Sequence, residues 1–147
     1  MYKCKYFKIT ELVNPTLLKQ IGENIAWTIF DETLLRAADA IREKYGAMTV
    51  NTPDLTDCGL RDPQSKTGAK YSMHKIGRAL DGHIVAIERA AAKITDAGAR
   101  KKYKIAEYNR VRGELMADPM FVELNFENNI NWLHFDTGNR ANRLFNP

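Results

Sequence analysis

At its centre the chain reads Ser72-Met73-His74-Lys75-Ile76-Gly77-Arg78-Ala79-Leu80-Asp81. This decapeptide places a histidine and an aspartate seven positions apart. On one continuous helix, seven residues make about two turns, so the two side chains would lie roughly 10 Å apart, too far for one ion. If His74 instead ends a loop and residues 77–81 run as a short strand, the loop can fold the imidazole back beside the Asp81 carboxylate. The decapeptide therefore predicts two ligands of one metal site.

A second motif supplies a third candidate ligand. It reads Asn131-Trp132-Leu133-His134-Phe135-Asp136-Thr137, and the alternation of a strand would put Trp132, His134 and Asp136 on one face. Two histidines and a carboxylate that leave a fourth position open suit catalytic zinc. Isolated histidines and aspartates are more often surface groups or satisfied core groups, so spacing alone leaves that alternative open.

Together, the two motifs resemble the signature of a family of zinc peptidases, the D-Ala-D-Ala carboxypeptidases and L-Ala-D-Glu endopeptidases. The resemblance is carried by the pattern Ser72-x-His74-x-x-Gly77-Arg78-Ala79-x-Asp81, followed by Trp132-x-His134-x-Asp136. Bacterial cell-wall carboxypeptidases, phage endolysins and the hedgehog signalling domain share the fold of this family. Further segments resemble its phage branch, namely Phe7–Val13, Ile41–Gly46, Val50-Asn51 and Gly59-Leu60-Arg61. The match covers most of the chain in order, except the region from about His83 to Pro119.

The resemblance implies an α+β fold, in which a small antiparallel sheet carries the zinc site and helices pack on one side of it. It also implies that Zn²⁺ is held by His74, Asp81 and His134, and that Arg61 binds a carbonyl or carboxylate of the substrate. A guanidinium suits that task because its planar fork bonds pairs of oxygens and stays charged at any working pH. A surface arginine in an ordinary salt bridge is the alternative for Arg61.

Members of the family also use a catalytic base, a Glu or Asp a few residues before the second histidine ligand. Many carboxypeptidase members place it three positions ahead of that histidine, where this chain has Asn131, and an amide cannot accept the proton. The longer, hedgehog-like spacing points closer to Glu127, seven positions before His134. Glu127 is therefore the predicted base, with Asp136 and Glu123 as alternatives.

Three further side chains are candidates for contact with the substrate, namely Ser72, Trp132 and Asp136. Ser72 could also cap or orient the loop of His74, and Trp132 could equally be a core residue. Asp136 could instead orient Arg61 or a histidine nitrogen, because metal-bound histidines usually donate their other N–H to an acceptor.

Hydrophobic periodicity predicts the elements in the first half of the chain. Thr16 is a candidate N-cap for a first helix, and a second helix is expected between the N-cap Asp31 and the C-cap Gly46. A short strand should follow at Met48–Val50, and residues 51–70 read as a long loop without periodicity.

The second half of the chain begins with a helical segment that the resemblance does not cover. This insert is expected over about 84–117, interrupted at Gly98. Residues 121–127 then alternate as a strand, and Asn128-Asn129 supplies a turn. An antiparallel hairpin with the strand of His134 is therefore predicted.

Composition limits the class of protein. The chain has 147 residues, of which 44% are hydrophobic, and this predicts one domain with its own core. The two cysteines, Cys4 and Cys58, argue against a disulfide scaffold and for folding in a reducing cytoplasm. No apolar run follows the charges at the N-terminus and no window approaches a membrane span, so neither a signal peptide nor membrane insertion is expected.

The net charge of +4 and the pI of about 9.1 favour approach to polyanions such as a cell-wall surface or nucleic acid. The densest basic cluster, Arg100–Lys104, falls in a predicted helix, where a solvated helix face is the simpler interpretation. A basic nucleic-acid-binding protein is the third hypothesis, but no nucleic-acid partner is predicted.

The prediction is thus a single zinc peptidase domain over residues 1–147 that hydrolyses the peptide stems of peptidoglycan. It would act as a D,D-carboxypeptidase or as an L-Ala-D-Glu-type endopeptidase. Without a signal peptide, a phage endolysin or virion-associated lysin would be made in the host cytoplasm and act at the cell wall after release or as part of a virion. The alternative from another class is a non-catalytic, zinc-stabilised binding or structural module of the same fold. The sequence leaves the oligomeric state open.

Overall fold

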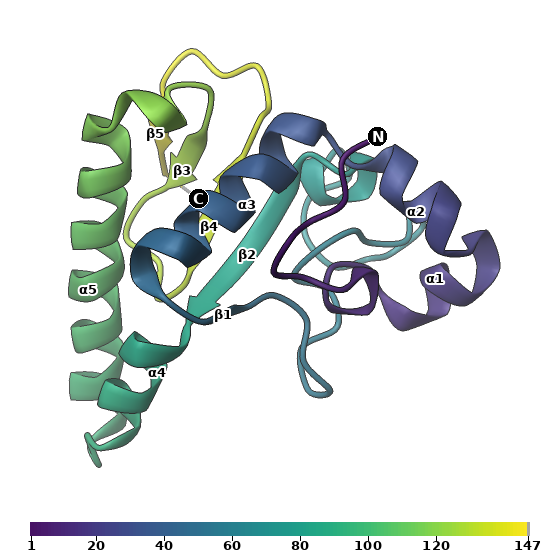
Figure 1. Cartoon of the computed structure of the whole chain (residues 1–147). Coiled ribbons are helices and arrows are strands. Elements are labelled where there is room, and N and C mark those ends of the chain that lie inside the picture. The colour runs from purple at the N-terminus through teal and green to yellow at the C-terminus, as the bar shows by residue number, and fades with distance from the viewer. Residues whose placement is uncertain (147) are drawn as a thin grey trace.

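A five-stranded sheet forms the centre of the computed structural model, which describes residues 1–146 (Figure 1). In their order across the sheet, the strands are β1 (Met48–Thr49), β2 (Ala79–Ile84), β4 (Leu133–Asp136), β3 (Asn125–Glu127) and β5 (Leu144–Phe145). The first four are antiparallel to their neighbours, as predicted, whereas β5 runs parallel to β3. The fold class is therefore α+β, but the sheet is mixed, because residues 137–143 return the chain to the open edge of β3 in the parallel direction.

The register of β2 and β4 brings the two motifs together. Asp81 lies directly opposite His134, and Leu80 lies opposite Phe135. Because side chains alternate across a strand, Leu80 and Phe135 share one face of the sheet, and Asp81 and His134 share the other. Leu80 and Phe135 are completely buried in the hydrophobic core, which leaves the opposite face for the polar cluster.

Helix α3 (Glu32–Tyr45) packs against β2 (Figure 1) and contributes the buried Leu34 to the same core. Asp31 caps the start of α3, where its carboxylate accepts a hydrogen bond from the backbone N–H of Leu34. Gly46 ends the helix with a φ of 83°. Both predicted caps of this helix are confirmed.

The first predicted helix is divided in two. Helices α1 (Pro15–Ile21) and α2 (Glu23–Ile29) meet at Gly22, whose φ of 77° interrupts the helix. The N-cap is Asn14 rather than the predicted Thr16. The reason is that the Asn14 side chain accepts a hydrogen bond from the backbone N–H of Thr16, while Pro15 takes the first helical position.

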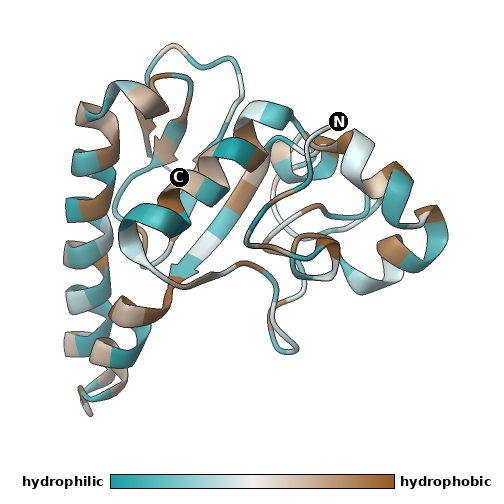
Figure 2. Cartoon of the chain, viewed as in Figure 1, coloured by the Kyte–Doolittle hydropathy of each residue, from teal (hydrophilic) through white to brown (hydrophobic). Residues whose placement is uncertain are grey.

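The predicted helical insert consists of α4 (Val85–Ala92) and α5 (Ala97–Ala117). The break falls at residues 93–96 instead of Gly98, because Asp96 caps α5 by accepting a hydrogen bond from the backbone N–H of Ala99. In Figure 1, α5 and the α1–α2 pair lie at opposite ends of the molecule, with α3 and β2 between them. Hydrophobic and hydrophilic residues alternate along α5 (Figure 2), as expected for a helix with one buried face.

The strand predicted over residues 121–127 begins only at Asn125. Upstream, Pro119–Phe121 forms the 3₁₀ helix η3, which Asp118 caps by accepting a hydrogen bond from the backbone N–H of Met120. The predicted antiparallel hairpin of β3 and β4 is present, and its turn contains Asn129 at a φ of 56°. Local capping by Asp118 and Pro119 has thus shortened the strand from its N-terminal side.

The long loop and the cysteines agree with the sequence prediction. Residues 51–70 contain no helix or strand. Cys4 and Cys58 are free thiols, and burial raises their pKa values to about 12 and about 11. Within residues 1–146, no helix has both the length and the apolar character needed to cross a membrane.

Candidate metal centre

A short 3₁₀ helix, η2 (Met73–Ile76), presents His74 to the sheet. Ser72 caps η2, since its hydroxyl oxygen accepts a hydrogen bond from the backbone N–H of His74 at 3.4 Å. Gly77 ends η2 with a φ of 70°, and a Cβ at this position would come within 2.6 Å of the Ile29 carbonyl oxygen. The chain then enters β2, so the fold-back predicted for the decapeptide is present, with a 3₁₀ turn where an irregular loop was expected.

The three predicted ligands form one buried cluster. His74 Nε2 lies 3.3 Å from Asp81 Oδ2, and His134 Nδ1 lies 2.7 Å from Asp81 Oδ1. One ligand atom from each residue lies within 4.8 Å of those from the other two. His74 is 3% exposed, and Asp81 and His134 are each 8% exposed. The cluster can therefore hold a metal ion away from bulk solvent.

The surroundings of the two imidazoles fit a metal ion. The nitrogen of each ring that points away from Asp81 has its own acceptor. His74 Nδ1 lies 3.0 Å from the Gly59 carbonyl oxygen, and His134 Nε2 lies 3.2 Å from Asp136 Oδ2. These acceptors favour a proton on the outer nitrogens, which leaves a lone pair on each inner nitrogen for the metal. Two imidazoles and one carboxylate form a donor set suited to zinc and similar divalent ions.

The charges of the cluster depend on hydrogen bonds inside it. Burial raises the pKa of Asp81, but hydrogen bonds from His134 and His74 outweigh burial and hold the pKa below its usual range. Burial lowers the pKa of His134, but hydrogen bonds to Asp136 and Asp81 outweigh burial and raise the pKa to about 9. The two carboxylates therefore favour the protonated form of His134 in the metal-free protein, and a metal ion bound at Nδ1 would take the place of the proton there.

Glu127, the predicted base, lies at the edge of the cluster. It ends β3, and its Oε2 is 4.0 Å from His134 Nδ1. Its side chain is 19% exposed and lines the same cleft as the three candidate ligands. Glu127 therefore lies beside the candidate ligands, in the wall of their cleft.

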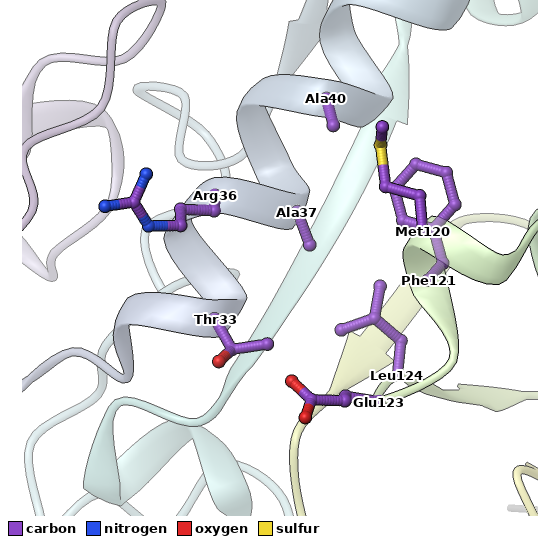
Figure 3. A pocket seen from close by; sticks show the side chains of 8 residues that line it. All are labelled: Thr33, Arg36, Ala37, Ala40, Met120, Phe121, Glu123 and Leu124. Carbon is purple, nitrogen blue, oxygen red and sulfur yellow. The ribbon is translucent and has the colours of Figure 1, made fainter.

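Glu123, one of the two alternative bases named from the sequence, does not line this cleft. Figure 3 shows Glu123 at a separate groove between α3 and the segment before β3. Because β3 begins only at Asn125, the strand alternation that would have aligned Glu123 with Glu127 does not extend to it. Glu123 is therefore not placed to act as the base.

Arg61 lies under the cluster and is 8% exposed. One terminal nitrogen, Nη2, donates a hydrogen bond to Asp81 Oδ2 at 3.2 Å, and Nε donates to the Asp57 carbonyl oxygen. Gly68 packs against the other terminal nitrogen, because a Cβ there would come within 2.7 Å of Nη1. Arg61 is thus a buried partner of Asp81 that also lines the cleft, rather than a surface arginine.

The cleft over the cluster has a volume of about 640 Å³. The predicted substrate residues Ser72 and Trp132 both line it, and Tyr71, which is 81% exposed, stands at its rim. The indole N–H of Trp132 is buried and has no hydrogen-bond partner among residues 1–146. Ser72 therefore combines the capping role with a place in the cleft wall, and Trp132 forms part of that wall.

Asp136 occupies a different place from the one expected of a substrate contact. It is completely buried, and its carboxylate accepts hydrogen bonds from Asn125, Gly138 and Arg140 as well as facing His134. Burial raises its pKa, but the hydrogen bonds, first of all those to His134 and Arg140, outweigh burial and hold the pKa below its usual range. Asp136 therefore orients a histidine nitrogen, one of the two alternatives drawn from the sequence, and it does not touch Arg61 or line the cleft.

Two groups that complete the site were not predicted. The Gly59 carbonyl is a backbone group that no side-chain motif encodes, and Arg140 lies in a polar tail without a motif. In the sequence, these two residues could have been noticed only because they lie close to predicted site residues. Gly59 is two residues before Arg61, and Arg140 is four residues after Asp136.

The chain matches no protein-family model, no curated protein and no solved structure. A functional assignment therefore depends on the two motifs and on the geometry of this site.

Proposed function

We propose that this chain is a zinc-dependent peptidase that hydrolyses peptide stems of peptidoglycan, as a D,D-carboxypeptidase or an L-Ala-D-Glu-type endopeptidase of a phage lysin. One observation carries the proposal. The buried cluster of His74, Asp81 and His134 lies in a cleft with Glu127 beside it and Arg61 beneath it. The resemblance of the two motifs to the zinc peptidase signature supports the choice of metal and substrate.

In this proposal, His74 Nε2, His134 Nδ1 and one Asp81 oxygen hold the zinc ion. The chemistry supplied by zinc in such a site is Lewis-acid activation of water and of a peptide carbonyl. Glu127 takes the proton from the attacking water and delivers it to the nitrogen of the leaving amine. The distance of 4.0 Å between Glu127 Oε2 and His134 Nδ1 supports this role, because it puts the carboxylate beside the candidate ligands.

Arg61 is the proposed anchor for the substrate. Its Nη2 and Nε are engaged with Asp81 and Asp57, which fixes the plane of the guanidinium at the base of the cleft. A fixed guanidinium with a remaining donor is suited to a substrate carbonyl or carboxylate. Ser72 and Trp132 supply the polar and aromatic parts of the cleft wall against which a peptide stem would lie.

The first experiment measures the zinc content of the purified protein together with the hydrolysis of peptidoglycan, followed both as loss of turbidity and as release of free D-alanine. The expected result is about one zinc per chain and hydrolysis that a chelator abolishes and added zinc restores. Release of D-alanine without loss of turbidity would identify a carboxypeptidase, and loss of turbidity with new amino termini would identify an endopeptidase.

The role of Glu127 is tested with Glu127→Gln, which keeps the shape of the side chain and removes the base. We expect kcat to fall by at least 10²-fold, since a positioned base contributes about that much or more, while zinc content stays the same. Glu123→Gln is the matched control, because Glu123 belongs to the same chain segment but faces the other groove. A zinc-loaded Glu127→Gln protein with full activity would exclude Glu127 as the base.

A second candidate function is a zinc-stabilised binding module without catalysis. It is favoured by Asn131, which stands where many carboxypeptidases of the family carry their base. This alternative predicts zinc binding with neither D-alanine release nor cleavage of stems, so the same experiment separates the two functions.

A further inference from the structure

Four residues contact the carboxylate of Asp136 through polar groups. Its Oδ1 accepts hydrogen bonds from Asn125 Nδ2 and the Gly138 backbone N–H, each at 2.9 Å. Its Oδ2 accepts from Arg140 Nε at 3.0 Å and Arg140 Nη2 at 2.8 Å, and lies 3.2 Å from His134 Nε2. A buried carboxylate with this many donors has a fixed position, and Arg140 supplies the only charged donor among them apart from His134.

Arg140 is itself held by the C-terminal tail. Its guanidinium lies over the ring of Phe145, 3.7 Å from the ring centroid. Phe145 belongs to β5, and its carbonyl oxygen accepts a hydrogen bond from the backbone N–H of Asn128 at 2.7 Å. The same ring meets His134 edge-on, with the ring centroids 5.9 Å apart. Arg140 and Phe145 thus enclose the outer side of the His134 imidazole.

From this arrangement we infer that Arg140 is a positioning residue for the metal site, acting on His134 through Asp136. The two hydrogen bonds from the Arg140 guanidinium hold Asp136 Oδ2 next to the outer nitrogen of His134, Nε2. This keeps the ring proton on Nε2 and turns Nδ1 toward Asp81, the orientation that metal binding requires. The inference rests on the metal site of the proposed function, but not on peptide hydrolysis.

The chemistry of the side chain explains why an arginine occupies this position. Two nitrogens of one planar guanidinium meet the same carboxylate oxygen, while the flat face of the group stacks on an aromatic ring. A lysine could supply the charge but neither a second nitrogen in the same plane nor a flat face that stacks on the ring. The conservative substitution therefore separates the charge of Arg140 from its geometry.

Arg140 also lines the cleft, so contact with the substrate is the rival explanation for its position. The two roles differ in what they change. A positioning residue alters metal affinity and the proton on His134 in the absence of substrate. A residue that only contacts the substrate alters the kinetic constants but leaves both of those properties unchanged.

The test compares zinc affinity of the wild-type full chain with that of Arg140→Gln and Arg140→Lys, using competition with a chromogenic chelator. Loss of an outer partner of a metal-bound histidine typically weakens metal binding by 10–100-fold, and we expect about 10-fold for Arg140→Gln. Arg140→Lys should recover part of this loss. Arg36→Gln is the matched control, because Arg36 makes the same two-nitrogen contact with Glu32 on α3, away from the cleft, and should leave zinc affinity unchanged.

A second measurement reports the proton itself. Long-range ¹H–¹⁵N NMR spectra of the zinc-loaded protein should show the Nε2-protonated tautomer of His134, with an Nε2–H that exchanges slowly with water. In Arg140→Gln this proton should exchange at least several-fold faster. A general loss of structure would disturb all histidines, including His83, whereas the positioning role affects His134 first.

The possible results separate this inference from the proposed function. Unchanged zinc affinity and unchanged Nε2–H exchange in Arg140→Gln, with or without a higher KM, would overturn the positioning role. Failure of the wild-type chain to bind zinc would overturn the metal site and this inference with it. Zinc binding that weakens in Arg140→Gln, in a protein that hydrolyses no stems, would support the inference while contradicting the proposed function.

Discussion

Gly59 has two roles beside the cluster. Its carbonyl oxygen accepts a hydrogen bond from the outer nitrogen of His74, and a Cβ at this position would collide with the carbonyl oxygen of Leu12. The obstacle is backbone rather than the end of a flexible side chain, so it cannot move aside easily. A substitution here must displace either the segment that carries Leu12 or the segment that leads to Arg61.

We therefore expect Gly59→Ala to destabilise the protein by about 3 kcal/mol, the upper part of the usual range for overpacking. Gly113→Ala is the opposite case, because Gly113 is an exposed glycine in α5 with no atom near its Cβ position. It should stabilise the protein by about 0.5–1 kcal/mol through the lower entropy of the unfolded chain. Chemical denaturation of the metal-free proteins measures both changes, and a Gly59→Ala variant as stable as Gly113→Ala would contradict the close approach of Gly59 to Leu12.

At the residue scale, the sequence identifies the residues whose own side chains could bind a metal ion. His74, Asp81 and His134 can be recognised as candidates because histidine and aspartate side chains are metal-ligating groups. Arg140 could not be found in this way, because its partner depends on how residues 137–143 turn after β4. A residue that acts through another residue has no characteristic sequence spacing from the metal ligands by which it could be recognised.

One acidic side chain links the two helices of the insert to the end of β2. Glu88 on α4 accepts a hydrogen bond from the Tyr108 hydroxyl of α5 at 2.8 Å and pairs with Lys104 Nζ at 2.8 Å. The Tyr108 oxygen in turn accepts a hydrogen bond from the backbone N–H of Ile84 at the end of β2. Glu88 therefore joins α4, α5 and β2.

This junction predicts a pH dependence of stability. Burial raises the pKa of Glu88, but hydrogen bonds from His83, Lys104 and Tyr108 outweigh burial and lower the pKa from 4.5 to about 2. Because the folded pKa lies below the unfolded one, the stabilisation is fully present above pH 4.5 and is lost as the pH falls from 4.5 toward about 2. Glu88→Gln should thus be clearly less stable than wild type near neutral pH, and the difference should shrink through this acid range.

Urea denaturation at a series of pH values measures this difference. Glu123→Gln, an exposed substitution outside both the junction and the cleft, serves as the control and should stay close to wild type throughout. A constant gap between wild type and Glu88→Gln from neutral pH down to the acid range would rule out the proposed contribution.

At the element scale, prediction succeeded where both ends of an element are marked locally. Asp31 caps the start of α3 with its side chain, and Gly46, with its positive φ, ends the helix. The strand predicted from Phe121 does not begin there. Asp118 caps a 3₁₀ turn that Pro119 starts, and this local turn is formed in place of the strand that the hydrophobic alternation indicated. Strand β5 has two residues and depends on pairing with β3, so no local sequence pattern could predict it.

At the scale of the whole molecule, the cluster joins two parts of the chain that are distant in sequence, namely the η2–β2 segment and strand β4. His74 comes from η2, Asp81 from β2 and His134 from β4, and Asp81 and His134 are 53 positions apart. Spacing predicted that His74 and Asp81 meet and offered His134 as a candidate third ligand, but it could not show that β2 pairs with β4. That pairing joins strands separated by α4, α5 and β3, so it is set by the global packing. A ligand that binds all three residues can bind only when these parts are assembled.

Zinc should therefore stabilise the folded chain as a whole. Binding to the native state alone contributes about 2.7 kcal/mol when free zinc is 100-fold above Kd, which corresponds to a rise in Tm of about 5–11 °C for a chain of this size. His74→Ala should abolish the rise, whereas His83→Ala should retain it, because His83 lies near Glu88 and outside the cluster. Thermal unfolding with excess zinc and with a chelator measures both effects. Equal shifts in the two variants would mean that zinc binds elsewhere, since only the loss of a true ligand removes the coupling between the ion and the assembled fold.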